Sequence, residues 1–425
     1  MNAPLAKNVS SPDSEKLILI GAEQPGAQGL SLEASLEELE GLAITAGYEP
    51  AAWMKQNLSR VNPGTFLGKG KLEELETAIL HHEADGVVFD DALSPTQNRN
   101  LEKILKCRVF DRPWLILEIF SRHAKTRAAK TQVELARLKY SLPRLSKMWS
   151  HLSRQRGGIG MKDVGETQIQ LDRRMVREQI SKLERKLVTL DKEKKTQNKR
   201  RQSAFTVSLV GYTNVGKSSL MNRLTEAGAL AENKLFATLD ATVRKIKRNH
   251  PYPILLTDTV GLINKLPHDL VASFKSTLDE VRNADLLINV VDISHPHYQE
   301  QMRVTTELLK ELNADSIDSI LVLNKIDALS PSERTDAENR HPDALFISCK
   351  TGNGVDAVRS AIDARYESQL ISCQVDLKYS QMKALSEIRK LGLITGEDYG
   401  EEIVSLQVQL FPQHKERLRR LLEEI

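Results

Sequence analysis

Short apolar runs alternate with helix-spaced stretches over residues 16–125. Four runs read as strands: LILIGAE (17–23), AAWMKQN (51–57), DGVVFDD (85–91) and CRVFDRP (107–113). Apolar residues recur at helical spacing in residues 32–47, 72–82 and 94–105, and the last of these opens with Ser-Pro, a common helix start. Strands that alternate with helices predict a parallel, layered α/β sheet.

The pattern changes over residues 126–200, where two apolar stripes follow heptad spacing. The stripes comprise Leu135, Leu138, Leu142, Leu145 and Trp149, then Val176, Ile180, Leu183, Leu187 and Leu190. Between them lies RQRGGIGMKDVGETQ (154–168), which contains four glycines. This arrangement predicts an antiparallel helical hairpin with a Gly-rich loop, and Pro143 should kink or interrupt its first helix.

Strand-like runs return after residue 203. They are FTVSLVG, PILLTDTVG, LLINVVDIS, SILVLNKID and ALFISCK, with helical patterns between them, and they predict a second α/β unit over residues 203–365. CQVDLKYS and IVSLQVQLF, each followed by a helical stretch, predict a small α+β domain over residues 366–425. Residues 1–15 are polar, and we expect a disordered lead-in there.

Composition places the chain among ordinary globular proteins. It has 425 residues, 40% apolar and 28% charged, which allows two to four domains. No apolar run reaches 18 residues and the N-terminus lacks a secretory pattern, so we expect no membrane span and a cytoplasmic location. We also expect a monomer. Three scattered cysteines and two isolated histidine pairs predict no cysteine or histidine metal site.

Charge is distributed unevenly along the chain. The net charge is +3, but residues 125–201 hold 22 Lys and Arg against 8 Asp and Glu, so this segment carries +14 and the remainder −11. A block of one sign favours a polyanionic partner such as nucleic acid, whereas a solvated helical face is the simpler alternative.

The strongest motif is GYTNVGKSS (211–219), which fits the spacing G-x-x-x-x-G-K-[ST] between a strand-like run and a helical stretch. Glycines let the backbone N–H groups turn toward phosphates, and the following helix adds positive potential. We expect Lys217 to contact the β- and γ-phosphates and the Ser218 hydroxyl to bind Mg²⁺. The predicted phosphate-binding residues are Gly211, Tyr212, Thr213, Asn214, Val215, Gly216, Lys217, Ser218 and Ser219.

A second motif, NKID, indicates which base is bound. The Asp327 carboxylate can accept hydrogen bonds from guanine N1–H and N2–H₂, and adenine lacks these donors in that geometry. Asn324 would tie this loop to the phosphate loop, and the Lys325 stem would cover the base. The following SCK offers backbone N–H groups to guanine O6. The predicted base-binding residues are Asn324, Lys325, Ile326, Asp327, Ser348, Cys349 and Lys350, and they favour GTP over ATP.

Two further segments resemble nucleotide-dependent switches. In DTVG (Asp258, Thr259, Val260 and Gly261), Asp258 can hold a Mg²⁺-bound water, and the Gly261 N–H can contact the γ-phosphate. FATLDATVR (236–244) is the expected first switch, where spacing alone leaves Thr238 and Thr242 open as the second Mg²⁺ hydroxyl. Leu262 follows DTVG where many such proteins have glutamine, and its side chain cannot orient water.

These motifs, together with RQRGGIGMKDVGETQIQLDRR, resemble the HflX family of translation-associated GTPases (Obg/HflX-type, TRAFAC class) over roughly residues 16–365. The resemblance implies a fold of class α/β, with an N-terminal α/β subdomain and helical hairpin followed by a P-loop, Ras-like G domain. It assigns Thr238 as the Mg²⁺ threonine within Phe236, Ala237, Thr238, Leu239 and Asp240. The family usually has an aromatic residue at position 262 and proline at positions 164 and 241, where this chain has leucine, valine and alanine.

The resemblance also implies a GTP-hydrolysing partner of the large ribosomal subunit, with a role in dissociating or rescuing ribosomes. The basic hairpin is the expected rRNA contact, through Arg154, Arg156, Lys162, Arg173 and Arg174. Asn214 makes K⁺ a second candidate ion, since related translation GTPases use asparagine there. Two alternatives stay open: a GTP-gated RNA-binding module with little turnover, and a GTPase for tRNA modification or ribosome assembly.

Overall fold

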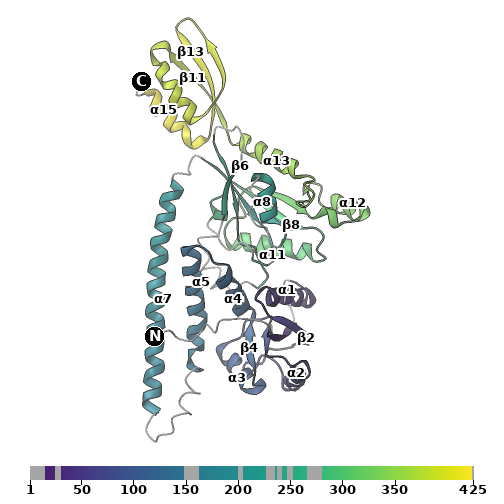
Figure 1. Cartoon of the computed structure of the whole chain (residues 1–425). Coiled ribbons are helices and arrows are strands. Elements are labelled where there is room, and N and C mark those ends of the chain that lie inside the picture. The colour runs from purple at the N-terminus through teal and green to yellow at the C-terminus, as the bar shows by residue number, and fades with distance from the viewer. Residues whose placement is uncertain are drawn as a thin grey trace.

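The computed structural model describes residues 15–23, 30–147, 162–199, 204–225, 235–236, 242–246, 252–265 and 280–423. Three sheets follow one another along an elongated molecule, with the C-terminal sheet at the end farthest from the N-terminal one (Figure 1). The long helix α7 runs beside the N-terminal sheet and reaches toward the middle sheet (Figure 1). The expected α/β fold class is confirmed.

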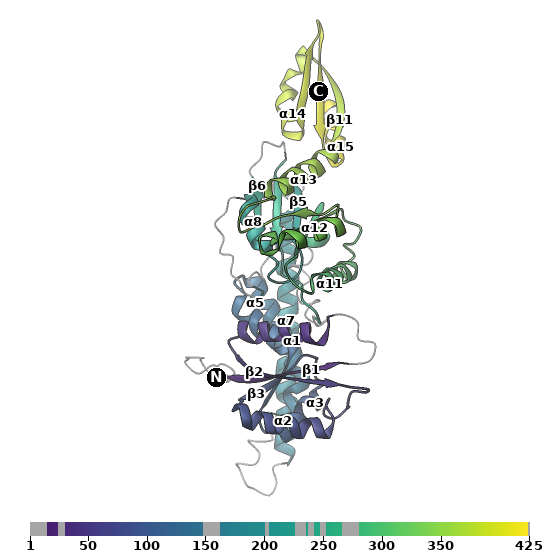
Figure 2. The ribbon, with the colours of Figure 1, turned by 90° about the vertical axis from the view of Figure 1, so that its right-hand side faces the viewer.

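The N-terminal sheet is parallel throughout, with strand order β2-β1-β3-β4. Its elements are β1 (Lys16–Glu23), α1 (Leu32–Thr45), β2 (Glu49–Asn57), α2 (Lys69–His82), β3 (Gly86–Phe89), α3 (Pro95–Leu105), β4 (Arg108–Asp111) and α4 (Arg112–His123). Helix α1 covers one face, and α2 and α3 cover the other (Figure 2). The predicted strands and helices are therefore present.

Helix α4 was not predicted, because the run CRVFDRP read as a strand through residue 113. The strand ends at Asp111, whose carboxylate caps the new helix by accepting from the Trp114 N–H at 3.0 Å. Pro113 then lies in the first helical turn, where its missing N–H costs nothing. The carboxyl end of β4 thus continues directly into a helix that lies next to the middle sheet.

The hairpin consists of α5 (Arg127–Ser141), a 3₁₀ turn η1 (Leu142–Lys147) and α7 (Lys162–Lys199). Helix α5 ends at Ser141, two residues before Pro143, so the predicted interruption of the first helix is confirmed. The expected loop through residue 168 is wrong for residues 162–168, which form the first turns of α7. The stripe residue Leu183 is buried, and cross-helix contacts join Gln179 to Glu134 at 3.0 Å and Lys139 to Glu184 at 2.8 Å.

The middle sheet has strand order β10-β9-β8-β5-β7-β6 and is parallel except for the edge strand β6. Its elements are β5 (Phe205–Val210), α8 (Lys217–Thr225), β6 (Thr242–Ile246), β7 (Ile254–Asp258), β8 (Leu286–Asp292), α11 (Tyr298–Glu311), β9 (Ser319–Asn324), η2 (Ile326–Ala328), α12 (Pro331–Arg340), β10 (Leu345–Phe346) and α13 (Val355–Ser368). The carboxyl ends of β5, β7 and β9 carry the three sequence motifs.

The C-terminal sheet is antiparallel, with order β11-β13-β12. It comprises β11 (Ile371–Lys378), η3 (Tyr379–Ala384), α14 (Leu385–Leu391), β12 (Leu393–Tyr399), β13 (Ile403–Leu410), η4 (Pro412–His414) and α15 (Lys415–Glu423). Phe411 joins it to the middle sheet, with ring centroids 4.7 Å from Tyr252 and 5.4 Å from Tyr366. Among the helices that the structure describes, none is both long and apolar enough to cross a membrane.

Candidate functional site

The phosphate loop connects β5 to α8, and its shape depends on two glycines. Gly211 has φ +143° and Gly216 has φ +99°, which other residues rarely adopt. A Cβ on Gly211 would lie 2.1 Å from the Val290 carbonyl oxygen, and one on Gly216 would lie 2.3 Å from Asn324 Nδ2. Both positions therefore exclude a side chain, since backbone or a buried amide already occupies the space.

Lys217 begins α8 with its ammonium folded back into the loop. Its Nζ donates to the carbonyl oxygens of Gly211 at 3.0 Å and Tyr212 at 2.6 Å. Burial lowers the pKa of Lys217 to about 8, against the opposing effect of Asp258. The loop thus holds a buried cation that a bound polyanion would stabilise.

Ser218 and Asp258 meet at the amino end of α8 and the carboxyl end of β7. The Ser218 Oγ donates to Asp258 Oδ2 at 2.6 Å. A hydroxyl and a carboxylate at this spacing are the oxygen ligands that Mg²⁺ prefers. Within the described residues, no group of three or more His, Cys, Asp or Glu is placed to hold a metal ion.

The base-binding segments are locked to the phosphate loop through Asn324. Its Nδ2 donates to the Val215 carbonyl oxygen at 2.8 Å, and its Oδ1 accepts from the Cys349 N–H at 3.0 Å. This amide, 2% exposed, joins the three segments that would contact phosphate and base. The Cys349 N–H is thereby already donated, and the Ser348 N–H donates to the Asn353 carbonyl oxygen at 2.9 Å, which leaves the Lys350 N–H as the candidate of this segment for guanine O6.

Asp327 is placed to present a carboxylate. Its Oδ1 accepts from the Ser348 Oγ at 2.6 Å, and this hydrogen bond lowers the pKa of Asp327 below its usual value. Lys350 Nζ lies 4.0 Å from Asp327 Oδ2, while Lys325 Nζ pairs with Asp292 at 2.6 Å. The predicted base-binding residues are gathered in one place, and their role in binding guanine stays a prediction.

Leu262 contacts the phosphate loop through its backbone. Its N–H donates to the Gly211 carbonyl oxygen at 3.1 Å, and its carbonyl oxygen accepts from the Thr213 N–H at 2.9 Å. The Leu262 side chain is buried. Earlier in the same segment, Thr259 Oγ1 donates to the Leu209 carbonyl oxygen of β5 at 2.6 Å. The DTVG segment therefore lies directly against the phosphate loop, with Gly261 beside Thr213 and Lys217.

The first switch and the basic loop are described in part. Phe236 is buried with φ +55° and packs edge-on against Phe120 of α4 at 4.7 Å between ring centroids. Thr242 begins β6 opposite Asp258. Six predicted site residues lie outside the described residues: Ala237, Thr238, Leu239 and Asp240 of the first switch, and Arg154 and Arg156 of the basic loop.

Three predicted RNA-contacting residues lie on α7. Lys162 begins the helix, and its side chain is outside the described part. Arg173 and Arg174 follow in the next turns, and the Arg174 side chain is 69% exposed beside Glu178 at 3.7 Å. These two arginines therefore lie on a helix, and their contact with RNA stays a prediction.

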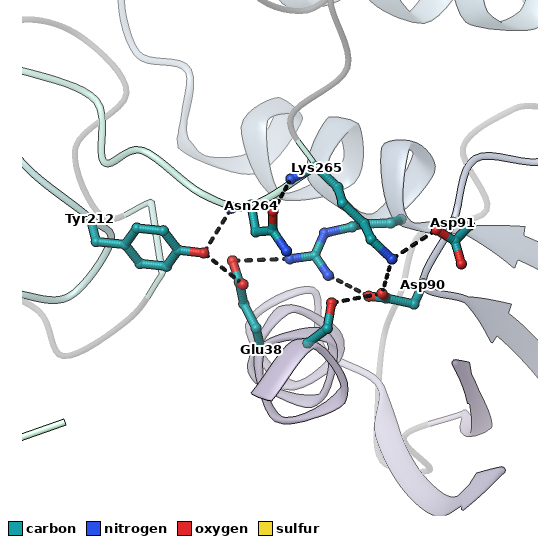
Figure 3. Close-up of polar contacts among 8 residues, drawn as sticks. Glu38, Asp90, Asp91, Tyr212, Asn264 and Lys265 are labelled. Atoms are coloured by element: carbon teal, nitrogen blue, oxygen red, sulfur yellow. Dashed lines mark hydrogen bonds and ion pairs between the residues drawn. The ribbon is translucent and has the colours of Figure 1, made fainter. Parts of the chain in front are cut away.

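Two sets of contacts were not found from the sequence. Arg223 of α8 donates to the carbonyl oxygens of Cys349 at 2.9 Å and Lys350 at 2.6 Å, which fixes the SCK segment. Tyr212 donates its hydroxyl to Glu38 of α1 at 2.8 Å (Figure 3). No motif marks Arg223, and no spacing rule links residues 174 positions apart.

Three comparisons place this site among known proteins. Family models described as GTP-binding GTPase N-terminal, GTP-binding GTPase middle region and 50S ribosome-binding GTPase match residues 33–121, 123–201 and 206–325. A protein named GTPase HflX from Flavobacterium psychrophilum is 50% identical over 74% of this chain and 76% of its own length. Another of that name, from Magnetococcus marinus, is 41% identical over 96% of this chain and 95% of its own length.

Among solved structures, a GTP-binding protein from the archaeon Sulfolobus solfataricus in complex with GDP covers 83% of this chain and 98% of its own. Its sequence identity is 24% and its TM-score is 0.43. That score is too low for a comparison of the two sites atom by atom.

Proposed function

Because the chain belongs to the HflX family of GTPases, we propose that it binds and hydrolyses GTP and associates with the large ribosomal subunit. The proposed nucleotide binding is supported by the side chain of Asn324. Its two hydrogen bonds join the phosphate loop at Val215 to the base-binding segment at Cys349. A single buried amide that holds these segments together supports one ligand with both phosphates and a base.

Mg²⁺ is the proposed cofactor, and the residues present fit it. Ser218 and Asp258 would hold it, Asp258 through a water molecule, and Thr238 is the third candidate from the resemblance. When bound, the ion would neutralise charge on the phosphates. Lys217 would contact the β- and γ-phosphates, and the Gly261 N–H would meet the γ-phosphate.

K⁺ is a second proposed ion, at Asn214. This residue has φ +60° in the phosphate loop, a backbone conformation that asparagine tolerates better than most residues. An ion there would offset developing charge on the phosphates. Comparing GTP turnover in K⁺ and in Na⁺ tests this role, and equal rates would exclude it.

Intrinsic turnover is proposed to be slow. Leu262 stands where a glutamine usually orients water, and its buried apolar side chain cannot do so. The missing group would come from the backbone, an ion or the ribosome. If the ribosome supplies that group, large subunits should increase turnover. Leu262 also favours the alternative of a GTP-gated RNA-binding module, and turnover that stays flat when large subunits are added would support that alternative.

The ribosome is proposed as the polyanionic partner of residues 125–201, which carry a net charge of +14. Phosphate contacts through Arg154, Arg156, Lys162, Arg173 and Arg174 are expected, with a role in protein synthesis, ribosome dissociation or rescue, or biogenesis. The alternative, a GTPase for tRNA modification or ribosome assembly, would also use the positive charge of residues 125–201 to bind its RNA partner.

Sedimentation with purified ribosomal subunits tests the proposal. The chain should co-sediment with the large subunit in the presence of a non-hydrolysable GTP analogue, and less so with GDP. Absence from the large-subunit fraction in both states would exclude the ribosomal part of the proposal. Nucleotide binding measured without ribosomes tests the other part separately.

A further inference from the structure

The crevice of the N-terminal sheet is filled by a side chain from the middle unit. In the order β2-β1-β3-β4 the chain direction across the sheet reverses between β1 and β3. Ligands of open parallel sheets bind at the carboxyl ends of the strands at such a reversal. Here Asp90 and Asp91 follow β3, and Lys265 extends its ammonium to both, at 2.5 Å and 2.7 Å (Figure 3).

A buried charge cluster surrounds this ammonium. Arg112 of α4 is fully buried and pairs with Asp90 and, at 3.0 Å, with Glu38. Ser35 Oγ also donates to Asp90 at 2.7 Å. Three carboxylates, those of Glu38, Asp90 and Asp91, thus face the two cations Arg112 and Lys265. Removing Lys265 would leave three carboxylates around one cation, a costly imbalance in a buried place.

The cluster also contacts the phosphate loop. Tyr212 donates its hydroxyl to Glu38 at 2.8 Å, and the same oxygen accepts from the Asn264 N–H at 2.8 Å (Figure 3). Asn264 and Lys265 directly follow the switch segment that contains Leu262. The N-terminal unit therefore holds both the phosphate loop and the end of this switch.

The switch segment lies close to the γ-phosphate side of the loop. A Cβ on Gly261 would lie 2.8 Å from Thr213 Cγ2 and 3.2 Å from Lys217 Nζ, and Leu262 is paired with Thr213. A γ-phosphate bound by Lys217 would have to share this space. The observed position therefore suits a nucleotide without a γ-phosphate better than one with it.

We propose that Lys265 is a positioning residue: its ion pairs with Asp90 and Asp91 hold residues 258–265 against the phosphate loop, so that the free protein favours GDP over GTP. The inference rests on the proposed GTP binding and adds its regulation. A ligand shifts a conformational equilibrium only by its differential affinity for the two states. Releasing Lys265 should therefore change the affinity for the triphosphate and leave that for GDP unchanged.

The test compares dissociation constants for a non-hydrolysable GTP analogue and for GDP in the full chain. Lys265→Met should raise the affinity for the analogue by about tenfold, within the usual range of such couplings, and leave that for GDP within about twofold. Lys55→Met is the matched control, since Lys55 pairs with Glu33 at 2.5 Å on the surface of the N-terminal unit and away from the phosphate loop. An unchanged ratio of the two affinities in Lys265→Met overturns the proposal.

A second variant approaches the contact from the other side. Asp91→Asn removes one partner of Lys265 and should shift the affinity ratio in the same direction. The double variant with Lys265→Met should shift it no further than the single one, because both changes break one contact. Fully additive shifts would contradict the proposal.

Hydrogen exchange distinguishes a positioning role of Lys265 from a general contribution to stability, because only the first predicts a local change in amide exchange rates. The Leu262 N–H donates to Gly211, so its exchange should become faster in Lys265→Met, while strand amides of β8 stay protected. Equal protection of Leu262 in both proteins overturns the proposal. If the wild type binds neither nucleotide, the proposed function itself fails, and this outcome is distinct from an unchanged affinity ratio.

Discussion

At the scale of single residues, Leu262 contributes through its backbone. Its N–H and carbonyl pair with Gly211 and Thr213, and its side chain fills a buried space beside the phosphate loop. The backbone pairing does not depend on which side chain is present. The leucine is thus compatible with a working switch, although it offers no group to orient water.

Leu262→Ala should leave GTP binding and basal turnover within about twofold of the wild type, and it should lower the free energy of unfolding by about 2–3 kcal/mol through the cavity. Fluorescent nucleotide titration, single-turnover hydrolysis and urea unfolding measure the three quantities. Ile263→Ala, which truncates the adjacent buried residue, is the control. Loss of hydrolysis in Leu262→Ala with binding intact would show that the side chain takes part.

Asp327→Asn should lower GTP affinity by at least about 100-fold, because the new amide presents a donor to guanine N2–H₂ and leaves that group unpaired. Xanthosine triphosphate has a carbonyl at this position and should bind the variant better than GTP does. Competition against a fluorescent guanine nucleotide measures both. Asp336→Asn, on the exposed face of α12, is the control. Undiminished GTP affinity in Asp327→Asn would contradict the assigned base contact.

The residues that the motifs identified belong to short segments with a recognisable pattern, even where, as for Asn324, their contacts lie far away in the sequence. Gly211 and Gly216 are required by loop geometry, and Asn324 by its fixed distance from the loop. Arg223 and Glu38 could not be found in this way, because a helix arginine and a helix glutamate have many solvated equivalents. Their roles depend on which distant segments the fold brings to them.

At the scale of elements, apolar periodicity predicted the central strands and the edge strands β2, β4, β10 and β11, and it missed the edge strands β6 and β12. β12 contains threonine, glycine and two acidic residues, and most of it is exposed, so its sequence carries little strand pattern. β6 is a five-residue edge strand with two adjacent basic residues. These two strands bury few of their side chains, so their composition differs little from that of loops.

The start of α7 shows the opposite error. Glycine and charge made residues 162–168 read as loop, yet they continue a helix whose stripe begins further on. A glycine inside a helix costs only about 1 kcal/mol, which a 38-residue helix tolerates easily. Arg173 and Arg174 consequently lie within a helix that already begins at Lys162.

Replacing both Arg173 and Arg174 with glutamine should weaken binding to large-subunit RNA by about tenfold at low salt and reduce the salt slope by about 2, one per lost phosphate contact. Binding measured across a salt series tests both. Arg334→Gln is the matched control, since Arg334 pairs with Glu338 four residues on, as Arg174 does with Glu178. An unchanged slope would place the RNA contact elsewhere.

At the scale of the whole molecule, neighbouring units meet through specific buried contacts. The N-terminal and middle units share the Lys265 cluster and the packing of Phe236 on Phe120. The middle and C-terminal units share the rings around Phe411, and Tyr252 donates its hydroxyl to the Leu391 carbonyl oxygen. Pattern analysis could separate the units, but it could not predict how they dock, because docking joins residues far apart in sequence.

Phe411→Ala should lower the free energy that holds the C-terminal unit against the middle unit by about 3–5 kcal/mol, because the ring packs between Tyr252 and Tyr366. Limited proteolysis should then release a fragment near residues 366–425 earlier than in the wild type. Phe66→Ala, a comparable truncation in the N-terminal core, should destabilise the chain without exposing that cleavage site. If both variants release this fragment at the same rate, Phe411 stabilises the whole chain and does not specifically hold the C-terminal unit.

Helix α7 also sets a length. Its 38 residues span about 57 Å, and five residues, 200–204, lead from its end to β5 and the phosphate loop. Deleting one heptad would keep its apolar stripe facing α5 and shorten its reach by about 10 Å. The number of residues in α7 therefore fixes how far from the phosphate loop Arg173 and Arg174 can touch a surface, independently of how strongly they bind there.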